Sequence, residues 1–151
     1  MKILIVEDDE FKLQNVANLV SERVSSARIV TARSIVSSLK TIEENADLNL
    51  VILDMSLPTY DVSPSESGGR PQGFGGLTVV RHLDGLDLHV PVIVITQFLS
   101  FGEGNDALEL EDVKSMLEQD HGAQFVGLVQ YSGGSDGWKD HLSRLLEGLS
   151  R

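Results

Sequence analysis

Two apolar segments of the chain end in carboxylate side chains. Residues 2–6 run into Glu7 and Asp8, and residues 50–53 run into Asp54. An apolar run bounded by polar residues indicates a strand buried on both faces, as in a parallel sheet. Sites in open parallel sheets lie beyond the carboxyl ends of the strands. If the two strands are neighbours, the three carboxylates converge there. Because clustered carboxylates repel one another, such a cluster usually binds a hard cation.

Strand and helix patterns alternate along the sequence. The predicted strands cover residues 2–6, 28–32, 49–54, 92–96 and 125–129, and the predicted helices cover residues 11–25, 76–86 and 109–121, with two more helices following Ser34 and Asp136. Five strand–helix units imply a parallel sheet with right-handed crossovers. For five strands the flavodoxin-like order 2-1-3-4-5 is the natural choice, which predicts a doubly wound (βα)5 fold of the α/β class. Strands one and three are neighbours in this order, so the carboxylates would meet.

Single residues mark several of the expected element ends. Asp9 is positioned to cap the first helix and Ser34 the second. Pro91 opens the fourth strand, where a missing N–H is tolerated. The third helix carries its pattern through Leu77, Val80, Arg81 and Leu83.

Length, composition and charge bound the class of protein. The 151 residues fit one domain spanning 1–151, and 41% hydrophobic residues with a mean hydropathy of −0.01 indicate a globular fold. A formal net charge of −11 argues against broad binding to nucleic acid, and solubility is its simplest consequence.

The chain offers no sign of export or of a membrane anchor. It contains no cysteine, so disulfides and thiolate chemistry are excluded. The first strand begins at residue 2 and leaves no room for a signal peptide. No apolar stretch approaches the roughly 18 residues that span a bilayer. We therefore expect a cytoplasmic protein.

The sequence resembles the receiver domains of two-component response regulators. The resemblance rests on the acidic pair Glu7-Asp8, on Asp54 with Leu57-Pro58 just beyond it, and on Thr96 after the fourth strand. It covers roughly residues 1–149, and no output domain is expected after Arg151. The resemblance thus implies a stand-alone receiver, or a fragment of a larger protein, that is a signalling module and not an enzyme.

The resemblance also implies roles for individual residues. Asp54 would be the phosphoacceptor in a phosphorelay, with Mg²⁺ held by Asp8 and Asp54, by the backbone carbonyl of Ser56, and through water by Glu7. The Thr96 hydroxyl would contact a phosphoryl oxygen and act as the switch. The expected partners are a histidine kinase or phosphotransfer protein and an unknown downstream protein, with a homodimer possible.

One departure from the family lies after the fifth strand. Receivers usually place a Lys there, followed by Pro, and the Lys pairs with the acidic cluster and the phosphoryl group. Here the nearest polar residue is Gln130, which can donate only a neutral hydrogen bond. Three replacements for the lost charge are conceivable: Arg70, Lys139, or the metal alone.

Two long connections and two aromatic residues complete the expectations. Residues 62–75 form an inserted loop rich in Ser, Pro and Gly, and residues 97–106 form an extended loop; both should border the acidic site. Receivers often carry a switching aromatic residue near the end of strand five. For Phe125 we expect ordinary core packing, and for Tyr131 exposure in a loop.

Two other functions remain open from the sequence. A pseudo-receiver would bind partners without phosphorylation, which the missing Lys favours and the set Glu7, Asp8, Asp54 and Thr96 opposes. A Mg²⁺-dependent phosphohydrolase with Asp54 as nucleophile is disfavoured. In haloacid-dehalogenase-like enzymes a second Asp would stand where this chain has Ser56.

Overall fold

A computed structural model describes residues 1–61, 75–97, 100–101 and 108–149 of the chain. Its main strands are β1 (Lys2–Val6), β2 (Arg28–Ala32), β3 (Leu50–Leu53), β4 (Val92–Thr96) and β7 (Phe125–Gln130). Its helices are α1 (Glu10–Arg23), α2 (Ile35–Glu44), α3 (Gly75–Gly85), α4 (Leu110–His121) and α5 (Gly137–Leu149). The expected elements are therefore present, with ends shifted by one or two residues.

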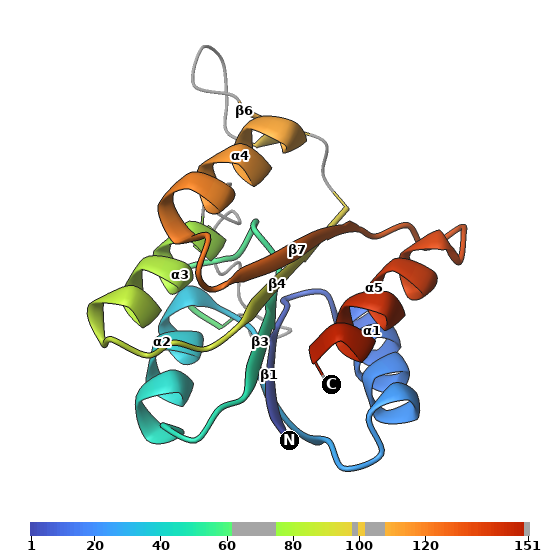
Figure 1. Cartoon of the computed structure of the whole chain (residues 1–151), viewed down its shortest axis with the longest axis horizontal. Coiled ribbons are helices and arrows are strands. Elements are labelled where there is room, and N and C mark those ends of the chain that lie inside the picture. The colour runs from blue at the N-terminus through green and yellow to red at the C-terminus, as the bar shows by residue number, and fades with distance from the viewer. Residues whose placement is uncertain (62–74, 98–99, 102–107, 150–151) are drawn as a thin grey trace.

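The five main strands form one parallel sheet in the order β2-β1-β3-β4-β7. This is the predicted order 2-1-3-4-5, so the flavodoxin-like fold is confirmed. Val6 of β1 pairs with Leu53 of β3, which aligns the carboxyl ends of the two strands. Figure 1 shows α1 and α5 on one face of this sheet and α2, α3 and α4 on the other.

Successive residues of the central strands face two separate cores. Leu4, Val51 and Leu53 pack under α2, α3 and α4, whereas Ile3, Ile5 and Ile52 pack under α1 and α5. This explains why the strands are apolar at every position and not at alternate ones. None of the described helices is both long and apolar enough to cross a membrane.

The helix caps predicted at Asp9 and Ser34 are present. The Asp9 side chain accepts the N–H of Lys12 at 3.0 Å at the start of α1. Ser34 accepts the N–H of Ser37 at 3.1 Å, and the two side chains form a reciprocal capping box at the start of α2. In α3, Val79 is buried on the core side while Arg81 is exposed, so the expected pattern was wrong at Arg81.

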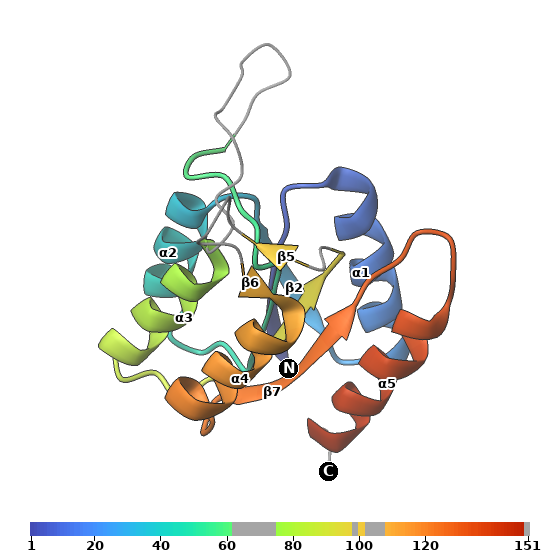
Figure 2. The same ribbon diagram turned by 90° about the horizontal axis from the view of Figure 1, so that it is seen from above.

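The connections differ in part from the expectation. Gly75 already belongs to α3, and residues 62–74 of the inserted loop lie outside the described residues. In the extended loop, β5 (Ser100–Phe101) pairs antiparallel with β6 (Leu108–Glu109), which lies just beyond the loop; the sequence did not predict this short ribbon. Figure 2 places this ribbon above the main sheet, near the start of α4.

Candidate functional site

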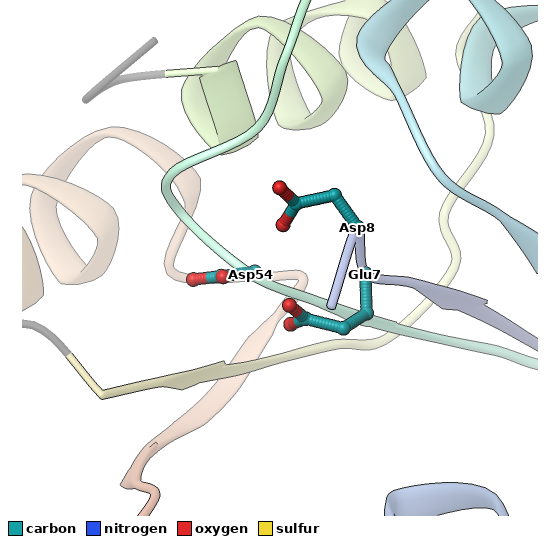
Figure 3. Close-up of side chains that lie close together, drawn as sticks. All are labelled: Glu7, Asp8 and Asp54. Atoms are coloured by element: carbon teal, nitrogen blue, oxygen red, sulfur yellow. The ribbon is translucent and has the colours of Figure 1, made fainter. Parts of the chain in front are cut away.

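The neighbouring ends of β1 and β3 bring three carboxylates together. Oxygen atoms of Glu7, Asp8 and Asp54 all lie within 4.8 Å of one another. Figure 3 shows the three side chains converging from the two strand ends. Glu7 and Asp54 are only 3% and 2% exposed, and Asp8 is half-buried. The convergence expected from the sequence is therefore present.

The turn after β3 holds the Asp54 side chain from one side. Asp54 Oδ1 accepts the backbone N–H of Ser56 at 3.3 Å. The N–H of Gly76, at the start of α3, donates to the carbonyl of Met55 at 2.9 Å. A Cβ on Gly76 would lie 2.6 Å from the Asp54 carbonyl oxygen, so only glycine allows this approach. The first turn of α3 thus fixes the backbone on which Asp54 stands.

A buried lysine contacts Glu7 and Asp54 from the other side of the cluster. This residue was not singled out from the sequence. Lys12 is 2% exposed, and its Nζ lies 2.7 Å from Glu7 Oε2 and 3.2 Å from Asp54 Oδ2. The same Nζ donates to the backbone carbonyl of Ile95 at 2.9 Å. One ammonium group therefore joins both buried carboxylates to the end of β4.

A signal for Lys12 does exist in the sequence. Lys12, Val16 and Leu19 are spaced i, i+4 and i+7, which places them on one face of α1, and all three are buried. A lysine on the apolar stripe of a helix, five residues after a buried Glu, is a candidate for an internal ion pair.

Burial and mutual repulsion raise the proton affinity of this cluster. Desolvation first, and then the charge of Asp54, raise the pKa of Glu7 to about 8, while Lys12 acts in the opposite sense. The same two causes, in the same order, raise the pKa of Asp8. The surroundings of the cluster thus disfavour the simultaneous ionisation of its carboxyl groups.

Two further predicted site residues lie at or beyond the carboxyl ends of β4 and β3. Thr96 ends β4, is fully buried, and its carbonyl accepts the N–H of Tyr131 at 2.8 Å. Ser56 is half-buried in the turn beyond Asp54. The described residues considered in connection with the missing lysine have other surroundings. Gln130 is exposed at the end of β7, Lys139 pairs with Asp136 at 3.4 Å, and Arg70 lies outside the described residues.

The two aromatic residues behave differently from each other. Phe125 is partly buried and packs against the core, as expected. Tyr131 is only 5% exposed, so the expected loop exposure was wrong. Its hydroxyl accepts a hydrogen bond from Asn15 at 3.0 Å, and its ring packs tilted against that of Trp138 with the ring centroids 4.9 Å apart. These α1 and α5 partners, distant in sequence, keep the residue in the core.

Solved structures of receiver domains share this fold. A CheY-like receiver domain protein from Methanospirillum hungatei JF-1 aligns with a TM-score of 0.63 at 19% identity, over 99% of this chain and 93% of that one. A chain of the CheX–CheY–BeF3–Mg²⁺ complex from Borrelia burgdorferi aligns with a TM-score of 0.68 at 15% identity, over 100% and 90%.

In its fold and its acidic cluster, the chain is similar to the response regulator receiver domains, which are signalling modules. No family model matches it. Among curated proteins, it is 25% identical to the Detocs response regulatory protein DtcB of Enterobacter cloacae, over 99% of this chain and 100% of that protein. It is also 27% identical to the uncharacterized protein y4jR of Sinorhizobium fredii, over the full length of both.

Proposed function

We propose that this receiver accepts a phosphoryl group on Asp54 and signals by binding another protein. The observation that carries the proposal is the meeting of Asp54 with two further carboxylates and one buried ammonium group at the carboxyl ends of adjacent strands. A carboxylate is a competent nucleophile for forming an aspartyl phosphate. Phosphoryl transfer also needs positive charge beside the transferred group, which this pocket can provide.

The donor set fits Mg²⁺. Three carboxylates within 4.8 Å offer the oxygen ligands that this ion prefers, and burial and the charge of Asp54 raise the pKa values of Glu7 and Asp8, an effect that a bound cation would oppose. Asp8, Asp54 and the Ser56 carbonyl would hold the ion directly, and Glu7 through water. When bound, it neutralises charge on the phosphoryl oxygens.

The residues of the chain carry out the transfer, orient the nucleophile and contact the transferred group. One Asp54 oxygen attacks phosphorus, the bond between phosphorus and the donor breaks, and its electron pair leaves with the donor. Before transfer the Ser56 N–H holds Oδ1 and Lys12 holds Oδ2, so both oxygens are oriented. Thr96, at the end of β4, contacts a phosphoryl oxygen through its hydroxyl and changes the surface near β4 and β7.

The partners in this proposal follow from the class of protein. A histidine kinase or a phosphotransfer protein supplies the phosphoryl group in the cytoplasm, and a downstream protein, or a second copy of the chain, reads the result. The curated relative of known class is named a response regulatory protein, which agrees with this role.

Phosphorylation by acetyl phosphate with Mg²⁺ tests the proposal. We expect intact mass spectrometry to show one added phosphoryl group, and borohydride trapping to locate it on Asp54. Asp54→Asn should take up none, whereas Asp61→Asn, an exposed carboxylate beyond the same strand, should label like the wild type. Label on another carboxylate, or label that survives in Asp54→Asn, would contradict the assignment.

A phosphorylation-independent interaction module is the second candidate. One observation favours it: Lys12 already occupies the space between Glu7 and Asp54 and neutralises part of their charge. This candidate predicts no acyl phosphate under any condition, and partner binding that is the same in the wild type and in Asp54→Asn. The labelling experiment therefore separates the two functions.

A further inference from the structure

We propose that Lys12, on α1, replaces the lysine that receivers usually carry after the last strand, contacting the phosphoryl group on Asp54 and relaying its arrival to β4 and β7. This inference rests on the proposed phosphorylation of Asp54. It assigns to the first helix a role that the family places at the opposite side of the pocket.

The position of the ammonium group supports the assignment. Lys12 Nζ lies 3.2 Å from Asp54 Oδ2, the oxygen that does not accept the Ser56 N–H. A phosphoryl group built on this carboxylate therefore forms within reach of Nζ. Lys12 is 2% exposed, so its charge is poorly screened by water and acts strongly on whatever enters the pocket.

The alternative cation at this end of the sheet is less well placed. Arg33 pairs with Glu10 at 2.7 Å and donates to the backbone carbonyl of Asp8 at 3.1 Å. Its side chain is 44% exposed, so it lies at the rim of the cluster. Of these two cations, only Lys12 contacts Asp54.

Lys12 also touches the elements through which a signal would leave. Its Nζ donates to the carbonyl of Ile95, next to Thr96 in β4, and lies 5.6 Å from the ring centroid of Tyr131, directly after β7. The ring of Tyr131 in turn packs tilted against that of Trp138 in α5. Movement of Nζ toward a phosphoryl oxygen would loosen its bond to Ile95 and change the surroundings of Tyr131.

The proposal predicts two opposite effects of Lys12→Met. Without Lys12, the unphosphorylated pocket is more negative and should bind Mg²⁺ severalfold more tightly. The phosphoryl mimic beryllofluoride loses a charged hydrogen bond and should bind about ten- to a hundredfold more weakly in saturating Mg²⁺. Fluorescence of Trp138, the single tryptophan, follows both titrations. General damage to the pocket would weaken both ligands together.

Three further variants sharpen the test. Lys139→Met removes an exposed lysine that pairs with Asp136, and both affinities should stay unchanged. Adding Gln130→Lys to Lys12→Met returns a cation to the last strand and should restore most of the beryllofluoride affinity. If Arg33→Met, and not Lys12→Met, produces the loss, the rim cation carries the role and our assignment is wrong.

A measurement on the wild type covers the case in which Lys12→Met does not fold. In protein labelled with ¹³C-lysine, the ε-CH2 signal of Lys12 should shift when beryllofluoride is added to the Mg²⁺-bound protein, while that of Lys139 stays in place. If the Lys12 signal does not shift in protein that does bind beryllofluoride, the role assigned to Lys12 is wrong, and only that assignment is overturned. Protein that binds no beryllofluoride and takes up no phosphoryl label overturns the proposed function instead.

Discussion

Glu7 makes the stability of the metal-free protein depend on pH. Its pKa is about 8 in the folded protein against 4.5 for a free side chain, so between these values the folded state binds more protons than the unfolded state. The free energy of unfolding should therefore fall as the pH rises from 4.5 to 8, by an amount on the order of a few kcal/mol. Urea unfolding in the presence of a chelator, followed by Trp138 fluorescence, measures this slope.

Glu7→Gln provides the control for this pH dependence. The amide keeps the shape of the side chain and cannot ionise, so most of the slope should disappear. Asp8 leaves a smaller slope of the same sign, because its pKa is also raised. An equal slope in Glu7→Gln and in the wild type would show that Glu7 does not titrate in this range.

At the scale of the elements, the cap of α1 also positions the buried lysine. Asp9 accepts the backbone N–H of Lys12 itself, so the cap and the ammonium group belong to the same turn. Asp9→Ala should lower the free energy of unfolding by about 1 kcal/mol, the usual effect of losing an N-cap. Asp9→Asn keeps an acceptor and should lose much less. Equal losses in both variants would point to the charge of Asp9 and not to its hydrogen bond.

The start of α3 has a stricter requirement. In Gly76→Ala the new Cβ would lie 2.6 Å from the Asp54 carbonyl and 2.9 Å from the Met55 Cα, both backbone atoms that cannot turn aside. We expect a loss of about 2 kcal/mol or more in the free energy of unfolding, together with weaker Mg²⁺ binding, because the turn that carries Asp54 must shift.

Gly85→Ala is the matched control within the same helix. A Cβ on Gly85 meets no atom within 4 Å, and alanine favours helix, so stability should stay equal or rise by up to about 1 kcal/mol. Thermal unfolding of both variants side by side checks the pair. Similar losses at the two positions would mean that helix propensity, and not the contact with the β3 turn, limits α3.

At the scale of the whole molecule, Mg²⁺ should stabilise the fold by mass action. An ion that binds only the folded state at about 100 times its Kd adds about 2.7 kcal/mol, which raises Tm by roughly 5–10 °C for a chain of this size. The gain should be lost in Asp54→Asn and kept in Asp61→Asn. Because the net charge is −11, the comparison needs KCl at equal ionic strength, which screens general repulsion without filling the site.

Local patterns in the sequence determined most of the architecture. Apolar runs and helical spacing were enough to find the five main strands and five helices, and the flavodoxin-like order expected for five such units is the observed strand order. Asp9 and Ser34 were identifiable as caps because an N-cap bonds within its own first turn. The meeting of Glu7, Asp8 and Asp54 followed from strand order alone, since aligned strand ends bring their next residues together.

Only the tertiary structure decided which group balances the negative charge of the acidic cluster. Lys12 reaches Ile95, 83 residues away in the sequence, and Tyr131 is buried by partners on α1 and α5. No helical or strand period encodes these contacts, because they depend on how closely α1 and α5 pack over the sheet. The sequence by itself determined that a cation was missing after the last strand. The packing of α1 decided that a buried lysine would stand beside Asp54 from the other side.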